Sequence, residues 1–340
     1  MSRRRTAYAL AVVIATGTAL PVPAQPAGGD RVTYRADGKV VTEAGEVQDS
    51  ARGVELAVGG KGKSIPAQDI VRVEYGTLTG VAPAELAAAR TLDDSSDAGK
   101  AQAAFADLVK KAAAAPDRTR RHLAYREAAA ALRALEGKTG ADLAADLRPV
   151  ADRLAAAATL ARASWEGWPA ARGAARLYAE LGDFAKAAET CAQLAAAPGL
   201  SPAQRHDAQL SAAAFHYHGG RPAAAEVLLA AVEKDGDAGP DRDRLAVLRA
   251  AAGGAGQLRP AVEAARDPAA KAVGTALLGN ALAAANQPRE AMWEYLRVEV
   301  VYAADRDARV VALTRLAAAA EKQGNKERAD QYRDKLSRVR

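Results

Sequence analysis

Two different spacings of apolar residues divide this chain into a short first part and a long second part. Between residues 31 and 75, apolar and polar positions alternate, most clearly over 53–58 and 69–75. This period of two is typical of strands that bury one face. Asp37-Gly38 is a strong signal for a two-residue hairpin turn. We therefore predict a small antiparallel β domain over residues 30–77, a meander of about four or five short strands.

After residue 84 the strand pattern stops, and apolar positions recur at helical spacing. The predicted helices are 100–115, 117–136 and 141–164. Pro116 and the glycines at 137 and 140 mark the breaks between them. Residues 84–166 are thus expected to form a helical lead-in whose repeat register the sequence does not define.

From residue 168 onward, one turn signature recurs along the chain. A Gly or Asn is followed five residues later by Ala, and successive copies begin 30 to 38 residues apart. The pairs are Gly182 and Ala187, Gly220 and Ala225, Gly256 and Ala261, Asn286 and Ala291, and Gly324 and Ala329. A residue that tolerates a left-handed backbone ends one helix, and the Ala lets the next helix pack closely against it. The spacing indicates repeated helical hairpins.

The same residues carry a resemblance to tetratricopeptide repeats (TPR), in degenerate form, over residues 168–340. The landmark residues are Ala175, Tyr178, Gly182-Asp183-Phe184 and Ala187 in the first copy, and Leu278-Gly279, Ala291 and Tyr295 in a later one. The last copy keeps Leu316, Ala317, Gly324 and Ala329, and the first-helix Trp of the family is missing throughout. The resemblance implies a mainly α fold: an α-solenoid of TPR-like helical hairpins preceded by the small antiparallel β domain, α+β overall.

This resemblance also implies where a protein or peptide partner would bind. Stacked hairpins leave a concave face lined by their first helices. The family's concave positions fall on Arg172, Arg176, Glu180, Tyr217, His218, Asn280, Thr314, Glu321 and Lys322. The carboxylate clamp of chaperone-binding repeats is absent, because only Asn280 occupies such a position.

The β part, from Val32 to Tyr75, resembles the small SH3-like or Sm-like half-barrels of bacterial envelope proteins. The resemblance rests on the charged turn, the strand beginning Gly45-Glu46-Val47, and the final Asp69–Tyr75 strand. It implies a unit that could add a peptide or a partner strand at its edge. The alternative is a structural cap with no ligand.

The first 24 residues resemble a secretory signal peptide. Arg3, Arg4 and Arg5 precede an apolar run from Tyr8 to Leu20, and a small-residue cleavage site ends at Ala24. The run is shorter than the roughly 20 residues that span a bilayer, and the alternative is a retained anchor. We expect an exported protein of the periplasm or cell envelope, with no transmembrane segment after signal cleavage.

Charge and composition argue against nucleic acid as a ligand. The chain has 47 basic and 41 acidic residues, a net charge of +6. Without Arg3, Arg4 and Arg5 there are 44 basic residues and the net charge is +3. Basic and acidic residues alternate, and aromatic residues make up only 4% of the chain. A nucleic-acid surface would need a basic patch with interleaved aromatics.

Little in the sequence points to catalysis or to a cofactor. The chain has four His and one Cys and lacks the common hydrolase, phosphate-binding and zinc-protease motifs. His216 and His218 would point about 200° apart on a helix, which disfavours a shared metal ion. Cys191 falls on an apolar helix face and is predicted to be a buried small hydrophobe. We predict a protein that is not an enzyme and has no cofactor.

Our main functional hypothesis is an exported scaffold that mediates protein–protein interaction through a TPR-like concave surface. The alternative is an envelope accessory protein that binds a glycan, or a metal through His216 and His218. The bulky run around Trp293 and Tyr295 is expected to pack in the core. Its alternative role is to dock a partner helix or a second copy of the chain, so homo-oligomerisation stays open.

Overall fold

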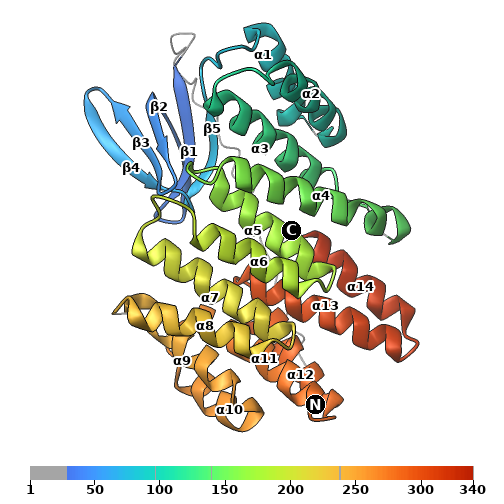
Figure 1. Cartoon of the computed structure of the whole chain (residues 1–340). Coiled ribbons are helices and arrows are strands. Elements are labelled where there is room, and N and C mark those ends of the chain that lie inside the picture. The colour runs from blue at the N-terminus through green and yellow to red at the C-terminus, as the bar shows by residue number, and fades with distance from the viewer. Residues whose placement is uncertain (1–28, 96, 139, 237–238, 340) are drawn as a thin grey trace, which may run out of the picture.

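The computed structural model describes residues 29–95, 97–138, 140–236 and 239–339. The expected signal peptide lies outside these residues. Within them, a five-stranded antiparallel sheet is followed by fourteen α-helices, which confirms the predicted mainly α fold with a small N-terminal β part (Figure 1). Across the same residues, no helix has both the length and the apolar character needed to cross a membrane.

The strands are β1 (Asp30–Ala36), β2 (Lys39–Ser50), β3 (Gly53–Val58), β4 (Lys61–Pro66) and β5 (Ile70–Glu74). They form one sheet in the order β4-β3-β2-β1-β5. Asp37 and Gly38 join β1 to β2 with φ angles of 50° and 74°, as the Asp-Gly pair predicts for a hairpin turn. The sheet edges are therefore β4 and β5, which are joined by only three residues.

The sheet buries one face against helices. Val32, Leu56 and Val73 are fully buried, and they share one hydrophobic cluster with Phe105 and Leu123 of the helical lead-in. A sheet of this size cannot enclose a core of its own, so the helices complete it. The β part is thus packed onto the helical part.

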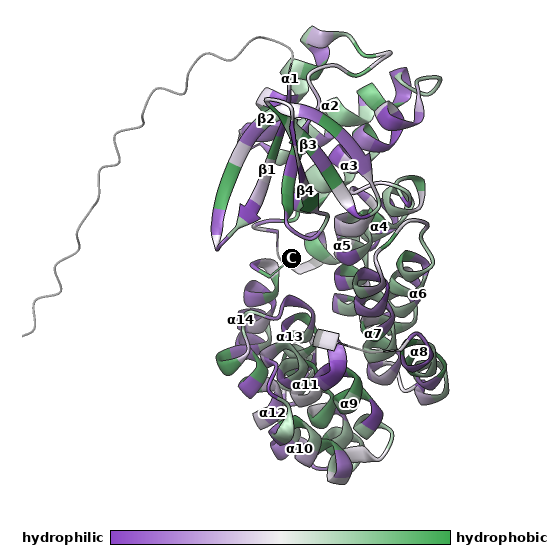
Figure 2. Cartoon of the chain, turned by 90° about the vertical axis from the view of Figure 1, so that its left-hand side faces the viewer, coloured by the Kyte–Doolittle hydropathy of each residue, from purple (hydrophilic) through white to green (hydrophobic). Residues whose placement is uncertain are grey.

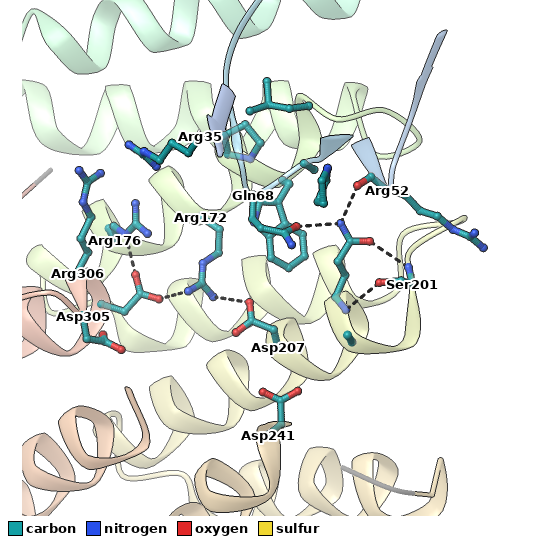
Figure 3. A pocket seen from close by; sticks show the side chains of 18 of the residues that line it. Arg35, Arg52, Gln68, Arg172, Arg176, Ser201, Asp207, Asp241, Asp305 and Arg306 are labelled. Carbon is teal, nitrogen blue, oxygen red and sulfur yellow. Dashed lines mark hydrogen bonds and ion pairs between the residues drawn. The ribbon is translucent and has the colours of Figure 1, made fainter. Parts of the chain in front are cut away.

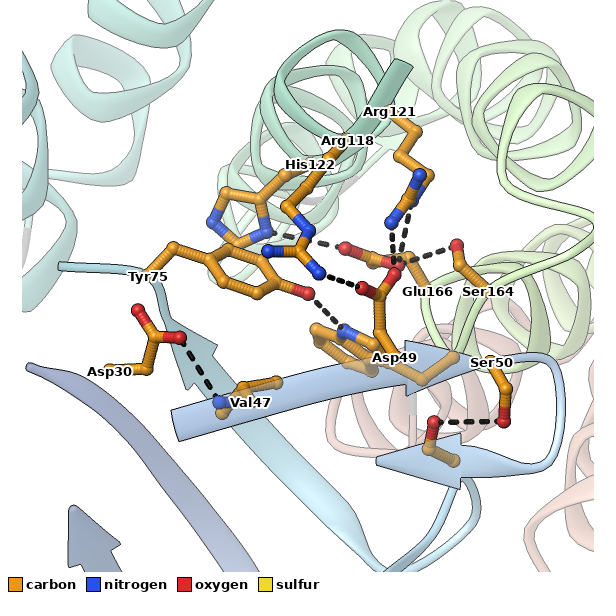
Figure 4. Close-up of polar contacts among 12 residues, drawn as sticks. Asp30, Val47, Asp49, Ser50, Tyr75, Arg118, Arg121, His122, Ser164 and Glu166 are labelled. Carbon is orange, nitrogen blue, oxygen red and sulfur yellow. Dashed lines mark hydrogen bonds and ion pairs between the residues drawn. The ribbon is translucent and has the colours of Figure 1, made fainter. Parts of the chain in front are cut away.

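Buried polar contacts fix the same junction (Figure 4). Asp49 of β2 accepts hydrogen bonds from Arg118, at 2.8 Å, and from Arg121. Glu166 is fully buried, and Ser164 Oγ donates to its carboxylate at 2.6 Å. Trp165 Nε1 donates to the Tyr75 hydroxyl at 3.2 Å. Because removing one partner would strand a buried charge, this junction is held in one geometry.

The lead-in helices are α1 (Pro83–Asp94), α2 (Ala98–Lys111), α3 (Asp117–Arg133) and α4 (Gly140–Leu160). The next helices are α5 (Gly167–Glu180), α6 (Phe184–Ala195), α7 (Pro202–His218), α8 (Pro222–Lys234), α9 (Arg242–Ala251), α10 (Gly254–Ala264), α11 (Pro268–Ala284), α12 (Pro288–Val301), α13 (Arg306–Lys322) and α14 (Lys326–Ser337), with a short 3₁₀ helix, η1 (Gly239–Asp241), before α9. From α5 onward they pair as hairpins.

Four of the five predicted turns lie where the signature put them. Gly182, Gly220, Asn286 and Gly324 all have left-handed backbones, with φ between 59° and 74°. The turn predicted at Gly256 is wrong. Gly256 lies inside α10, and the left-handed residue is Gly254, two positions earlier, with φ of 69°. Several small residues compete as the turn in this Gly-rich segment, and only one of them can adopt the left-handed backbone between the two helices.

The hairpins curve until the last returns to the first. Figure 1 shows α13 beside α5, and Figure 2 shows α13 and α14 facing α5 to α8 with the sheet above them. The contact between α5 and α13 is direct, since Arg176 Nε donates to Asp307 at 2.7 Å. The inner face of the array is therefore largely filled by the protein's own side chains, and an opening remains at the end that faces the sheet.

Candidate functional site

A large cavity lies where the sheet meets the two ends of the helical ring, that is, of the array of hairpins from α5 to α14 whose last hairpin packs on its first. It has a volume of about 940 Å³, at the upper end of the range for ligand sites. Its walls come from the sheet and its turns, from residues 168–176 of α5, from residues 201–207 at the start of α7, from Asp241, and from residues 304–307 at the start of α13 (Figure 3). Segments that lie far apart in the chain thus line one space.

Helix caps hold two of these walls in place. Ser201 and Gln204 form a capping box at the start of α7, and Gln204 Nε2 also donates to the Arg52 carbonyl at 3.1 Å, which ties α7 to the sheet. Asp305 caps α13 by accepting from the backbone N–H of Ala308 at 2.9 Å. The side chains that follow each cap are therefore aimed into the cavity by a rigid helix start.

A network of arginines and aspartates forms the cavity floor. Asp307 accepts hydrogen bonds from Arg172 and from Arg176. Arg244 donates to Asp207 at 2.5 Å, and Arg172 lies 3.6 Å from the same carboxylate. Burial opposes the ionisation of Asp307, but Arg172 and Arg176 outweigh it and hold its pKa well below the ordinary 3.8. The two carboxylates are thus neutralised by the arginines around them.

Two other aspartates of the cavity are shifted the opposite way. Burial raises the pKa of Asp241, with Asp207 adding to the shift. Burial and the neighbouring Asp307 raise the pKa of Asp305. Pairs of acids shifted in opposite directions occur in catalytic sites. Asp207 and Asp307 are tied in ion pairs and Asp305 is tied as a helix cap, whereas the Asp241 side chain makes no hydrogen bond or ion pair with any described residue.

One side of the cavity carries positive charge. Figure 3 shows Arg35, from β1, and Arg306, at the start of α13, on the same side as Arg176. Across the part of the chain that the structure describes, neither Arg35 nor Arg306 has an ion pair. Partial burial lowers the pKa of Arg306, and Arg176 and Arg35 lower it further. Three like charges thus lie together on one side of the cavity.

Five of the nine predicted partner-binding residues line one of two cavities. Arg172 and Arg176 line the large cavity, although both already bind Asp307. Glu180, His218 and Thr314 line a second cavity of about 430 Å³ on the other side of the α5–α13 contact.

A hydrogen bond with Asn280 determines which ring nitrogen of His218 carries the proton. Tyr295 donates to Asn280 Oδ1 at 2.7 Å, so the amide nitrogen of Asn280 is the atom 2.7 Å from His218 Nδ1. His218 Nδ1 must then accept, which places the proton on Nε2. Burial, with Arg315 adding to it, lowers the pKa of His218 to about 3. His218 is therefore a neutral histidine.

The remaining predicted residues lie apart from both cavities. Tyr217 donates to Glu226 at 2.5 Å. Glu321 is paired with Arg333, and Lys322 is exposed. Within the described residues, no three His, Cys, Asp or Glu side chains are grouped closely enough to hold a metal ion. The nine predicted positions therefore do not form one surface.

Sequence reasoning missed several residues that enclose the large cavity. Arg35 belongs to a strand and Arg306 to a helix start more than 250 residues later, and no local pattern connects them. Asp207 and Asp307 are single polar positions near the starts of helices, where acidic residues are common for helix-dipole reasons alone. The only available signal was the cap sequence at Ser201 and at Asp305, which locates helix starts without showing that they meet.

No family model matches this chain, and no curated protein or solved structure is significantly similar to it.

Proposed function

We propose that this protein is a non-enzymatic scaffold whose binding site for a protein or peptide partner is the cavity between the sheet and the helical ring. The observation that carries the proposal is the cavity itself, which has a volume of about 940 Å³ and is lined by the sheet, α5, α7, Asp241 and the start of α13. Caps and ion pairs fix its walls before any partner arrives, and a preformed site loses little free energy to ordering when it binds.

The proposed binding site differs from the concave face that the resemblance to tetratricopeptide repeats implies. Repeat proteins of that family use an open groove along their first helices. Here α13 packs on α5, and Arg172 and Arg176 are engaged with Asp307. A partner would therefore enter at the sheet end of the ring. The family assignment, export and residence in the periplasm or cell envelope belong to the same proposal and rest on the sequence patterns alone.

The state of the polar groups supports a binding role over a catalytic one. Cys191 is fully buried, and burial raises the pKa of its thiol to about 12, so it is a poor nucleophile. Asp207 and Asp307 are held by arginines. A general base needs a free lone pair facing the cavity, and among its aspartates only Asp241 has no side-chain hydrogen bond or ion pair with a described residue.

The alternative function, an accessory protein that binds an envelope glycan, is favoured by one feature of the same cavity. Ser64 and Gln68 of the sheet and Ser201 of α7 line it beside Trp168, which is the mixture of hydroxyl, amide and aromatic groups that a sugar would contact. The metal version has less support, because Asn280 already occupies His218 Nδ1.

In-cell crosslinking of the full chain tests the scaffold proposal. Ala203 is exposed and lines the cavity, so Ala203→Trp should obstruct it and reduce the capture of partners. Ala230 is exposed on α8, outside the cavity, and Ala230→Trp is the matched control. Capture that survives Ala203→Trp as it survives Ala230→Trp would contradict the proposed site.

A further inference from the structure

We propose that the positive side of the large cavity, formed by Arg35, Arg176 and Arg306, is a binding site for an oxyanion, a carboxylate or a phosphate carried by the ligand. The inference rests on the proposed function to the extent that this cavity is the binding site, and it adds the chemical class of the group that is recognised. We call these three residues the arginine triad.

The arginine triad is built from three separate elements. Arg35 lies near the end of β1, Arg176 in the second half of α5, and Arg306 is the first residue of α13. The junction between the sheet and the helices, and the contact between α5 and α13, fix these elements relative to one another. The fold thus brings the three guanidinium groups together, and among the described residues only Arg176 has an acidic partner, Asp307.

The donors of the triad are available to a ligand. Arg35 and Arg306 have no ion pair with any described residue. Arg176 donates to Asp307 through Nε, and among the described residues no hydrogen bond is made by its two terminal nitrogens. A guanidinium presents its N–H groups as a planar fork that matches the two oxygens of a carboxylate or phosphate.

Charge repulsion favours an anion at this place. Three guanidinium groups face one opening, and both Arg176 and Arg35 disfavour the charged form of Arg306. A bound oxyanion would offset this repulsion, because its negative charge attracts all three guanidinium groups. The start of α13, a helix of 17 residues, adds partial positive charge from its first backbone N–H groups.

The acids in the same cavity set the strength of binding. Asp207 and Asp307 are each paired with arginines of the floor, so their charges are already compensated. Asp241 and Asp305 also line the cavity, and Asp305 directly precedes Arg306 in the sequence. These two carboxylates would repel an anion and weaken its binding. We therefore expect a dissociation constant of about 0.1 to 1 mM for a small oxyanion.

Isothermal titration of the purified full chain with inorganic phosphate, and separately with citrate, tests the site. We expect saturable binding of one anion per chain, weakened by added salt. Arg35→Gln and Arg306→Gln should each raise the dissociation constant about tenfold, as expected for the loss of one charge-assisted hydrogen-bonding group. Phosphate binding without citrate binding would identify a phosphate ligand, and the reverse would identify a carboxylate ligand.

Arg52→Gln is the matched control. Arg52 lines the same cavity, but its Nε donates to the Gly199 carbonyl at 3.0 Å on the opposite side (Figure 3). The variant loses the same charge, so the dissociation constant should change by less than about twofold if recognition is local. Arg35 and Arg306 have no ion pairs to lose, and thermal melts of both variants should match wild type.

Two results would overturn the inference: no saturable binding of either anion, or equal weakening by Arg52→Gln and Arg306→Gln. The scaffold proposal fails separately. Anion binding by a protein whose crosslinked partners survive Ala203→Trp would support the oxyanion site and refute the scaffold role of the cavity. Loss of partners in Ala203→Trp, together with no anion binding by the wild-type protein, would support the scaffold role and refute the oxyanion site.

Discussion

The carboxylate of Asp307 joins the last hairpin of the ring to the first, and replacing it should show how much that closure contributes to stability. Asp307→Asn keeps the size of the side chain and removes its charge. Arg172 and Arg176 would then face a neutral amide in place of their shared carboxylate. We expect a loss of unfolding free energy and a local loosening of α13 from α5.

The magnitude follows from the burial of the three groups. The side chains of Asp307, Arg172 and Arg176 are only 16%, 17% and 21% exposed. An exposed ion pair contributes about 0–1 kcal/mol, whereas breaking a buried pair costs about 3–5 kcal/mol. In the variant, Arg172 keeps its weaker contact with Asp207 at 3.6 Å. We therefore expect Asp307→Asn to lower the unfolding free energy by about 2–4 kcal/mol.

The pH dependence gives this prediction a second readout. The folded-state pKa of Asp307 lies below the 3.8 of the unfolded chain, so its contribution is fully present above that value. The contribution is lost as the pH falls from about 4 toward the folded-state pKa. The difference between wild type and Asp307→Asn should therefore be constant from about pH 5 to about pH 8 and should shrink below about pH 4.

Urea unfolding followed by circular dichroism measures the free energy, and amide hydrogen exchange measures the opening of α13. Asp334→Asn is the control, since Asp334 pairs with Arg338 at an exposed site and its loss should not be measurable. A loss below about 0.5 kcal/mol for Asp307→Asn would refute the reasoning. So would a difference from wild type that persists unchanged at low pH.

Three further predictions concern the helical core. His218, with its pKa of about 3, stays neutral while the unfolded chain takes up a proton, so stability should fall by about 2 kcal/mol between about pH 6.5 and 5 in urea melts, and His218→Gln should flatten this slope. Cys191, with its pKa of about 12, should react with a thiol reagent only after denaturation, and rapid labelling of the native protein would contradict its burial. Gly279→Ala would place a Cβ 2.5 Å from the Tyr295 ring and should lower the melting temperature, whereas Gly256→Ala meets nothing within 4 Å and should leave it unchanged or raise it.

Local patterns were enough to predict most elements of this protein, although helix α1 (Pro83–Asp94) was not among the predicted helices. The alternation over residues 30–77 and the pair Asp37-Gly38 predicted the sheet, because strand pairing through a two-residue turn depends on neighbouring residues. Turns such as that at Gly182 were predictable for the same reason. The misplaced turn at Gly256 shows the limit of such patterns, since a segment rich in small residues offers several positions with the same local preference.

The candidate site was not predictable in the same way. Of the arginine triad only Arg176 was expected to bind a partner, and it was expected on an open concave face. Arg35 and Arg306 had no local signal at all, because their meeting depends on how far the hairpins turn. That curvature is the sum of small rotations at each hairpin interface, and each rotation depends on side-chain packing that a repeat pattern does not specify.

The sequence by itself therefore determined most of the elements, their order and the positions of most turns, since these follow from periodicity and backbone preference over a few residues. The tertiary structure alone decided that α13 returns to α5, that Asp307 neutralises Arg172 and Arg176, and that the sheet lies over the opening that remains. The physical reason is that a cavity between distant segments depends on the accumulated geometry of every interface between them.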